Sequence, residues 1–170
     1  MEGCDPGDNM ENIRSGELPT LIFCIVVCQL AGVLGSVFTR SSVHTWYQTL
    51  TKPWFTPQGW IITTVWLVLF TLMGLSLFLV YREGLTRVDV RMALGIFAVQ
   101  LLVNVLWSMV FFGLRWPMGG LATIAVLLVL IALTILKFWP ISREAALLLM
   151  PYLLWVCFAA FLNYSIWRLN

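Results

Sequence analysis

The sequence predicts an all-α integral membrane protein, a bundle of five transmembrane helices. Of its 170 residues 61% are hydrophobic and only 11% are charged, whereas a soluble domain is about 25% charged. The charged residues leave five uncharged intervals, each long enough to cross a bilayer as a helix. These are residues 18–39, 53–81, 92–114, 116–136 and 145–167. We therefore expect residues 18–170 to form a single membrane domain.

The amino-terminal segment, residues 1–17, differs from the rest in charge. It holds five acidic side chains against one basic side chain, Arg14. It lacks the basic start of a cleaved signal peptide, so we expect a disordered acidic tail. The remainder holds nine Lys and Arg against three acidic residues, spread singly over helix ends and loops. A nucleic acid is therefore not an expected partner.

We expect the five helices at about residues 19–39, 57–81, 92–114, 117–138 and 142–167. Pro19 suits the start of the first helix, because its missing N–H would be unpaired there in any case. Farther along, Ala31 with Gly35 and Gly32 with Ser36 form two pairs of small residues four apart. This spacing lets membrane helices approach closely and predicts a packing face.

The longest connector, residues 40–58, is too aromatic to be a plain solvated loop. It contains the only histidine of the chain, two prolines and four large aromatic residues: Trp46, Tyr47, Trp54 and Phe55. These aromatic side chains are expected either to anchor the chain at the lipid headgroups or to fold inward as a lid over the helices. Composition alone leaves both alternatives open.

The later helices differ in what they contain. The fourth, 117–138, is almost uniformly aliphatic, which suits lipid contact better than a binding site. The fifth begins with Ser142 as a capping residue and carries Pro151 near its middle. A proline at that place is expected to kink the helix or to open its backbone hydrogen bonds.

Polar residues inside the spans are few, and each must find a partner or line a wet cavity. On the third helix Gln100, Asn104 and Trp107 follow at i, i+4 and i+7 and share one face. Comparable positions on the second and fifth helices are Trp66, Trp155, Ala159 and Leu162. The amides are expected either to join helices by hydrogen bonds or to line an apolar, aromatic-walled pocket for a flat ligand.

Several classes of function lack their usual residues. The four cysteines and the single histidine assemble no metal set, and no cofactor motif is found. The spans hold no acidic residue, which proton-coupled transporters and ion channels generally need. Neither a nucleophile with its base nor a pair of carboxylates is visible, so hydrolysis and phosphoryl transfer are not expected.

Three motifs in the right order give the chain a strong resemblance to the translocator protein family, also called tryptophan-rich sensory proteins or peripheral benzodiazepine receptors. The first comprises Trp46, Tyr47, Lys52, Pro53, Trp54, Phe55, Pro57, Trp60, Trp66, Met73 and Gly74. The second comprises Gln100, Leu101, Asn104, Trp107, Phe111, Phe112 and Gly113. The third runs from Pro151 to Arg168. The resemblance covers about residues 19–170.

The resemblance implies a five-helix membrane bundle, often a homodimer, in a prokaryotic envelope membrane or an organelle membrane such as the mitochondrial outer membrane. Its ligand cavity would lie between the helices under the connector, which favours the lid. Members bind porphyrins and haem, sterols in some lineages, and synthetic drugs. Carried over by motif, the ligand-facing residues are Tyr47, Pro57, Trp66, Gln100, Asn104, Trp107, Trp155, Ala159 and Leu162.

The resemblance leaves three functions in competition. The first is a tetrapyrrole-binding protein that senses, sequesters or moves porphyrins. The second is an enzyme that degrades protoporphyrin in light, with Trp66 and Trp155 as the participating indoles. The third is a sterol or lipid carrier, for which Leu162, Tyr164 and Arg168 match a weak cholesterol pattern.

The chain departs from the family at two places. Met118-Gly119-Gly120 stands where animal members often carry a tryptophan, which argues against drug binding of the animal type. Gly95 is followed by Val99 where some members have a second glycine. The small pairs of the first helix are therefore an alternative dimer face.

Overall fold

A computed structural model describes residues 17–170, and all regular secondary structure within that range is helical. The expected acidic tail lies outside the described residues except for Glu17, which begins the first helix. The elements are α1 (Glu17–Val43), α2 (Trp46–Thr49), α3 (Gly59–Tyr81), α4 (Val88–Ser108), the π-helical turn η2 (Met109–Gly113), α5 (Pro117–Phe138), α6 (Arg143–Leu148) and α7 (Met150–Leu169).

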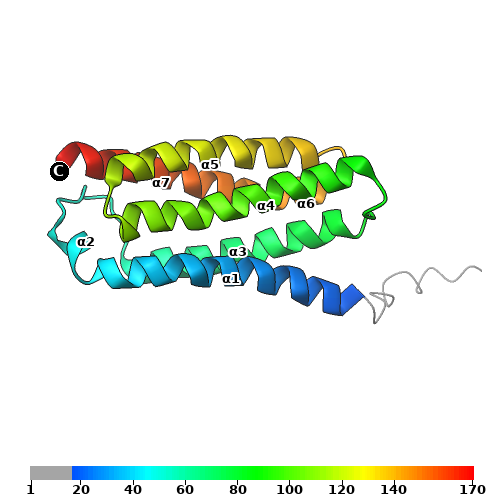
Figure 1. Ribbon diagram of the computed structural model, residues 1–170, viewed down its shortest axis with the longest axis horizontal. Helices are drawn as coiled ribbons and strands as arrows, with labels where there is room; N and C mark the ends of the chain where they lie inside the picture. Colours follow the sequence, from blue (N-terminus) through cyan, green and yellow to red (C-terminus); the bar gives the residue numbers. More distant parts are fainter. Residues whose placement is uncertain (1–16) are drawn as a thin grey trace, which may run out of the picture.

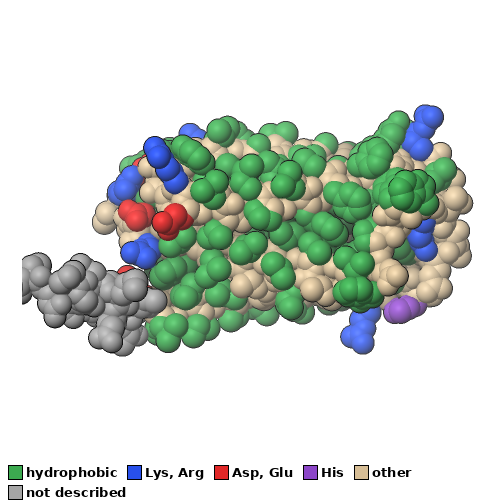
Figure 2. All heavy atoms as spheres, turned by 180° about the vertical axis from the view of Figure 1, so that it is seen from behind, with side chains coloured by type: hydrophobic (Ala, Val, Ile, Leu, Met, Phe, Trp, Pro, Cys, Tyr) green, Lys and Arg blue, Asp and Glu red, His purple; other side chains and the backbone are tan. Residues whose placement is uncertain are grey.

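Five helical segments are long and apolar enough to cross a membrane: α1, α3, α4 with η2, α5, and α6 with α7. They lie side by side along the long axis of the molecule, with α2 and the carboxyl terminus at one end (Figure 1). We call this end the connector end. The face seen in Figure 2 has charged side chains only near its two ends, with a mostly hydrophobic band between them. The prediction of a five-helix, multi-pass integral membrane protein is confirmed.

Two predicted helix boundaries are wrong because helices continue into polar sequence. The first helix runs on to Val43, so the connector is shorter than residues 40–58. Ser42 is buried there and donates a 2.6 Å hydrogen bond from Oγ to the carbonyl oxygen of Phe112, which ties the end of α1 to η2. The third helix begins at Val88, before the predicted 92, and has Asp89 in its first turn, where the helix dipole favours a carboxylate.

The fifth span is divided at Leu149 and is not one helix from 142 to 167. Ser142 caps α6 as expected, since its Oγ accepts a 3.2 Å hydrogen bond from the N–H of Ala145. Pro151 occupies the first turn of α7, where a residue without an N–H is tolerated. The proline thus starts a new helix instead of bending an existing one.

The small residues of α1 are used for packing inside the chain. A Cβ atom at Gly32 would lie 2.6 Å from the ring of Phe70 on α3, and one at Gly35 would lie 3.1 Å from Oγ of Ser108 on α4. The predicted packing face of α1 therefore meets α3 and α4. It is not left free for a second copy of the chain.

The fourth span has two faces. Ile124, Leu127 and Ile131 are buried where α5 packs between α4 and α7, while Val126 and Val129 are more than half exposed. Lipid contact is thus expected for the outer face only. The inner face belongs to the core of the bundle.

The closest approach of α1 to α3 generates a prediction. A Cβ atom at Gly74 would lie 2.5 Å from Cα of Ile25, so Gly74→Ala must push two backbones apart. We expect a loss of about 1–3 kcal/mol in the free energy of unfolding, measured by thermal unfolding in detergent. Gly95→Ala is the matched control, because its Cβ meets nothing within 4 Å. Equal destabilisation by both variants would contradict this account.

Candidate functional site

A cavity of about 400 Å³ lies in the half of the bundle near the connector end. Residues of α1, α3, α4, η2 and α7 line it, together with Tyr47 of α2 and Pro57 of the connector. No residue of α5 or α6 takes part, and no lining side chain is charged. The cavity is therefore an apolar compartment with a small number of neutral polar groups.

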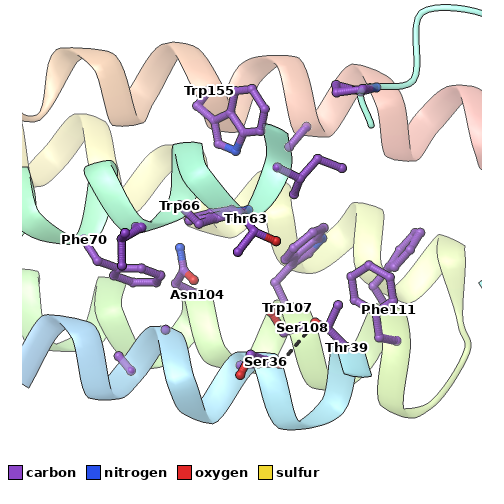
Figure 3. A pocket seen from close by; sticks show the side chains of 18 of the residues that line it. Ser36, Thr39, Thr63, Trp66, Phe70, Asn104, Trp107, Ser108, Phe111 and Trp155 are labelled. Carbon is purple, nitrogen blue, oxygen red and sulfur yellow. Dashed lines mark hydrogen bonds between the residues drawn. The ribbon is translucent and has the colours of Figure 1, made fainter. Parts of the chain in front are cut away.

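The cavity brings together eight of the nine residues expected to face a ligand: Tyr47, Pro57, Trp66, Asn104, Trp107, Trp155, Ala159 and Leu162. They come from four separated segments of the sequence. In Figure 3, Trp66, Trp107 and Trp155 lie around one space, with Asn104 on the side of α4.

Aromatic rings form the walls of this space and support one another. The indole of Trp66 stacks on Phe70 with 5.5 Å between ring centroids, and that of Trp107 stacks on Phe111 at 5.7 Å. Trp155 lies 5.4 Å from Phe158. Because each indole packs against a phenyl ring, the walls are held in place without a ligand.

Two of the indoles present hydrogen-bond donors that have no partner. Nε1 of Trp107 and Nε1 of Trp155 are buried and make no hydrogen bond within residues 17–170. The Oδ1 atom of Asn163, which also lines the cavity, is an unpartnered buried acceptor. An unpaired buried polar group is costly, so these atoms suit a ligand that carries both hydrogen-bond acceptors and donors.

Asn104 serves the fold and the cavity together. Its Nδ2 donates a 2.8 Å hydrogen bond to the hydroxyl oxygen of Tyr152 on α7, which is the helix-joining role expected of an intramembrane amide. The residue also lines the cavity. The two alternatives from the sequence therefore do not exclude each other at this position.

Gln100 is the predicted residue that the structure places elsewhere. It is fully buried but does not line the cavity, and neither atom of its amide has a partner in the described chain. Tyr152 is also fully buried and contacts Trp66 with ring centroids 6.3 Å apart. Tyr152 also forms the hydrogen bond with Asn104, so the cavity ends near Asn104. Gln100 lies one helical turn farther from the connector end.

A polar strip on one side of the cavity was missed by the sequence analysis. It consists of lining residues of two helices: Ser36 and Thr39 on α1, and Thr63 and Thr64 on α3. Ser36, Thr63 and Thr64 are exposed as well as cavity-lining, so the cavity opens between α1 and α3. The signal available in the sequence was the pair of hydroxyl residues in each helix near the connector end.

Gln29 borders the same opening from α1. Its Nε2 donates hydrogen bonds of 3.0 Å to the carbonyl oxygen of Leu67 and 2.9 Å to Oγ1 of Thr71. The amide thereby joins α1 to α3 beside the opening.

Some residues of the connector pack against the end of the bundle, and others are exposed. Phe55 stacks on Phe161 of α7 with centroids 5.3 Å apart, and Thr51 exchanges two hydrogen bonds with the side chain of Asn170. Trp54, by contrast, is 96% exposed. The connector thus covers the end of the bundle through Tyr47, Phe55 and Pro57, while Trp54 points outward.

The residues of the cholesterol pattern do not share a surface. Leu162 lines the cavity, whereas Tyr164 is exposed and lies beside Trp167, with ring centroids 6.0 Å apart. Arg168 is exposed too. Tyr164 and Trp167 have the arrangement of an interfacial anchor.

Metal-ligating residues are scattered. Cys24 and Cys28 are buried on α1 and Cys157 is exposed on α7, and residues 17–170 contain no cluster of three His, Cys, Asp or Glu.

Comparison with known proteins agrees with this geometry. The model of the TspO/MBR family matches residues 24–168. Tryptophan-rich protein TspO of Chlorobaculum tepidum is 42% identical over 154 residues, covering 91% of this chain and 98% of that protein. Translocator protein of Bos taurus is 37% identical over 143 residues, covering 83% and 84%. Protein CrtK of Rhodobacter capsulatus is 34% identical over 145 residues, covering 85% and 89%. The chain belongs to the TspO/MBR family.

Proposed function

We propose that this membrane protein binds a tetrapyrrole, protoporphyrin or haem, in the cavity between α1, α3, α4 and α7, for sensing, sequestration or translocation. The observation that carries the proposal is the set of three indoles around one apolar cavity, two of them with unpartnered N–H groups. Its volume of about 400 Å³ lies in the usual range for small-molecule sites, about 300–1,000 Å³.

The chemistry of the walls suits a large flat ring. Indole and phenyl faces stack favourably on an extended π system, and the cavity has indole or phenyl side chains from α3, α4, η2 and α7. The carboxylates of a protoporphyrin or haem supply hydrogen-bond acceptors for the unpaired indole N–H groups. The name of the Bos taurus relative, translocator protein, fits a membrane protein that passes on a ligand.

Trp155→Phe tests the proposal. It keeps an aromatic face and removes the unpartnered N–H, so the free energy of unfolding should stay unchanged or rise slightly. Loss of a hydrogen bond to the ligand should weaken protoporphyrin binding by about 5-fold, corresponding to about 1 kcal/mol. Binding is measured by absorption titration and stability by thermal unfolding.

Trp139→Phe is the matched control, because Trp139 lies at the opposite end of the bundle and is 47% exposed. It should leave protoporphyrin affinity unchanged. If Trp155→Phe lowers stability and leaves affinity intact, the indole is structural and the proposed site is wrong.

A second function, light-dependent degradation of protoporphyrin, is favoured by Trp66 and Trp155 lining the same cavity. A bound porphyrin would absorb the light, dissolved dioxygen would be the oxidant, and the indoles would act as radical or quenching partners. Binding alone requires none of these reactions.

Illumination separates the two functions. If the protein is an enzyme, the protoporphyrin absorption bands should decay in light with the protein, persist in darkness, and persist in light without oxygen. The Trp66→Phe, Trp155→Phe double variant should slow the decay at equal porphyrin occupancy. Decay at the rate of free porphyrin would leave binding as the function.

The connector is proposed as the lid of this site, held down by Phe55. Removing the stack on Phe161 with Phe55→Ala should speed porphyrin release several-fold in stopped-flow measurements, while the association rate changes less. Trp54→Ala is the control, since its side chain is 96% exposed. Equal release rates in both variants and the parent would place the route of exchange at the opening between α1 and α3.

The proposed homodimer would use another surface than the small-residue face of α1, which packs against α3 and α4. On α4, Val99 is 48% exposed and Leu102 is 70% exposed, and the space around Gly95 is open. These residues share one face of the helix. A sterol ligand is less well supported, because Leu162 and Tyr164 face different surroundings.

A further inference from the structure

The two ends of the bundle differ in the charges that they carry. All four acidic side chains of residues 17–170 lie at the end opposite the connector: Glu17, Glu83, Asp89 and Glu144. Four basic side chains lie at the connector end: Arg40, Lys52, Arg115 and Arg168. Red acidic groups accordingly appear at only one end of the face in Figure 2, while blue basic groups appear at both.

The ion pairs follow the same division between the two ends of the bundle. At the acidic end Arg87 lies 2.7 Å from the carboxylate of Asp89 and 3.8 Å from that of Glu83. At the connector end no basic side chain forms an ion pair within the described residues, because that end has no acidic side chain. The cavity therefore lies near the end of the bundle whose charged side chains are all basic.

Lys52 is the basic residue that structural contacts link to the cavity. Its Nζ lies 4.8 Å from the centre of the Tyr47 ring, and Tyr47 lines the cavity. The lysine is half-buried. Its ammonium group thus stands beside the connector wall of a compartment that has no charged lining of its own.

The phenol of Tyr47 adds a second donor at this place. Burial raises the pKa of Tyr47, so its hydroxyl stays protonated at neutral pH. The Tyr47 ring also contacts Phe112, with ring centroids 5.6 Å apart. An ammonium group and a phenol therefore lie next to each other at the connector side of the cavity.

We propose that Lys52 is the anchor for the carboxylate of a ligand whose apolar body fills the cavity. The ligand class is an amphipathic acid: a flat hydrophobic ring system that carries at least one carboxylate. This inference rests on the proposed function and names a residue for the acidic side chains of its ligand.

The physical reason is the cost of burying a charge. A carboxylate inside the cavity would meet only neutral groups, and an unpaired buried ion is strongly unfavourable. At the connector side, beside Lys52, the carboxylate stays partly hydrated and gains a charge-assisted hydrogen bond. The ligand is therefore oriented with its acid groups towards the connector and its apolar edge towards Asn104.

The phosphate of a lipid headgroup has chemistry similar to a carboxylate and is the other possible source of an anion for Lys52. Comparing two ligands distinguishes the two sources of the anion. Protoporphyrin carries two free carboxylates, whereas its dimethyl ester keeps the ring and loses both charges. A lysine that holds lipid phosphate will not distinguish the two compounds.

The experiment uses the full chain in nanodiscs of phosphatidylcholine and compares both compounds by tryptophan fluorescence quenching. We expect Lys52→Gln to raise the Kd for protoporphyrin about 5- to 10-fold and to leave the Kd for the dimethyl ester within about 2-fold. Lys52→Arg should restore most of the affinity. Lys137→Gln, at the opposite end of the bundle, should change neither Kd.

Equal effects of Lys52→Gln on the acid and the ester, or no effect on either, would overturn the anchor. If the effect of Lys52→Gln on protoporphyrin binding disappears in nanodiscs that contain anionic lipid, the lysine holds a lipid phosphate, which also overturns the anchor. Failure of the unaltered protein to bind either compound would instead overturn the proposed function itself. Equal unfolding temperatures of the parent and Lys52→Gln would show that a change in affinity does not come from misfolding of the variant.

Discussion

The lack of water inside a bilayer governs both the fold and the site. Every backbone polar group within the hydrocarbon region must be satisfied by the protein, so the chain crosses as helices and breaks only where a cap or a neighbour repairs the break. The division at Leu149 obeys this constraint, since the N–H of Leu149 donates to the carbonyl oxygen of Ala146, its own carbonyl accepts from the N–H of Leu153, and Pro151 has no donor to satisfy. A cavity in such a bundle is bounded by rigid, fully bonded helices.

The same constraint makes unpaired side-chain groups informative. Most hydroxyl groups near the cavity are satisfied locally: Thr63 and Thr64 donate to carbonyl oxygens of their own helix. The indole N–H groups of Trp107 and Trp155 are not. The neighbouring hydroxyl groups already have hydrogen-bond partners, whereas these two indole N–H groups have none. A ligand therefore gains the most binding free energy by placing hydrogen-bond acceptors next to these two groups.

The sequence was sufficient for the five spans and for most of the cavity. The charged residues separate the five spans from one another. The positions of Trp66, Asn104 and Trp155 within their helices, together with the family resemblance, predict the residues that line the cavity. The sequence did not predict that Gln100 lies outside the cavity. Periodicity gives the face of a helix but not the depth at which a cavity ends, and here the ring of Tyr152, a residue on another helix, sets that depth. The opening between α1 and α3 depends likewise on how two nearly uniformly apolar helices are rotated, which their hydropathy does not specify.

The cavity lies at one end of the bundle, so its two sides, the opening between α1 and α3 and the connector side, differ in polarity and charge. The opening between α1 and α3 is bordered by Leu67 and by hydroxyl groups already bonded within their helices, so it suits an apolar ligand dissolved in the bilayer. The connector side is bordered by Tyr47 and Lys52 and faces the positive end. An amphipathic acid in a membrane already keeps its charge at the interface and its ring in the hydrocarbon. Such a molecule is therefore presented to the protein in the orientation that the cavity and the charge distribution require, and little reorientation is needed for binding.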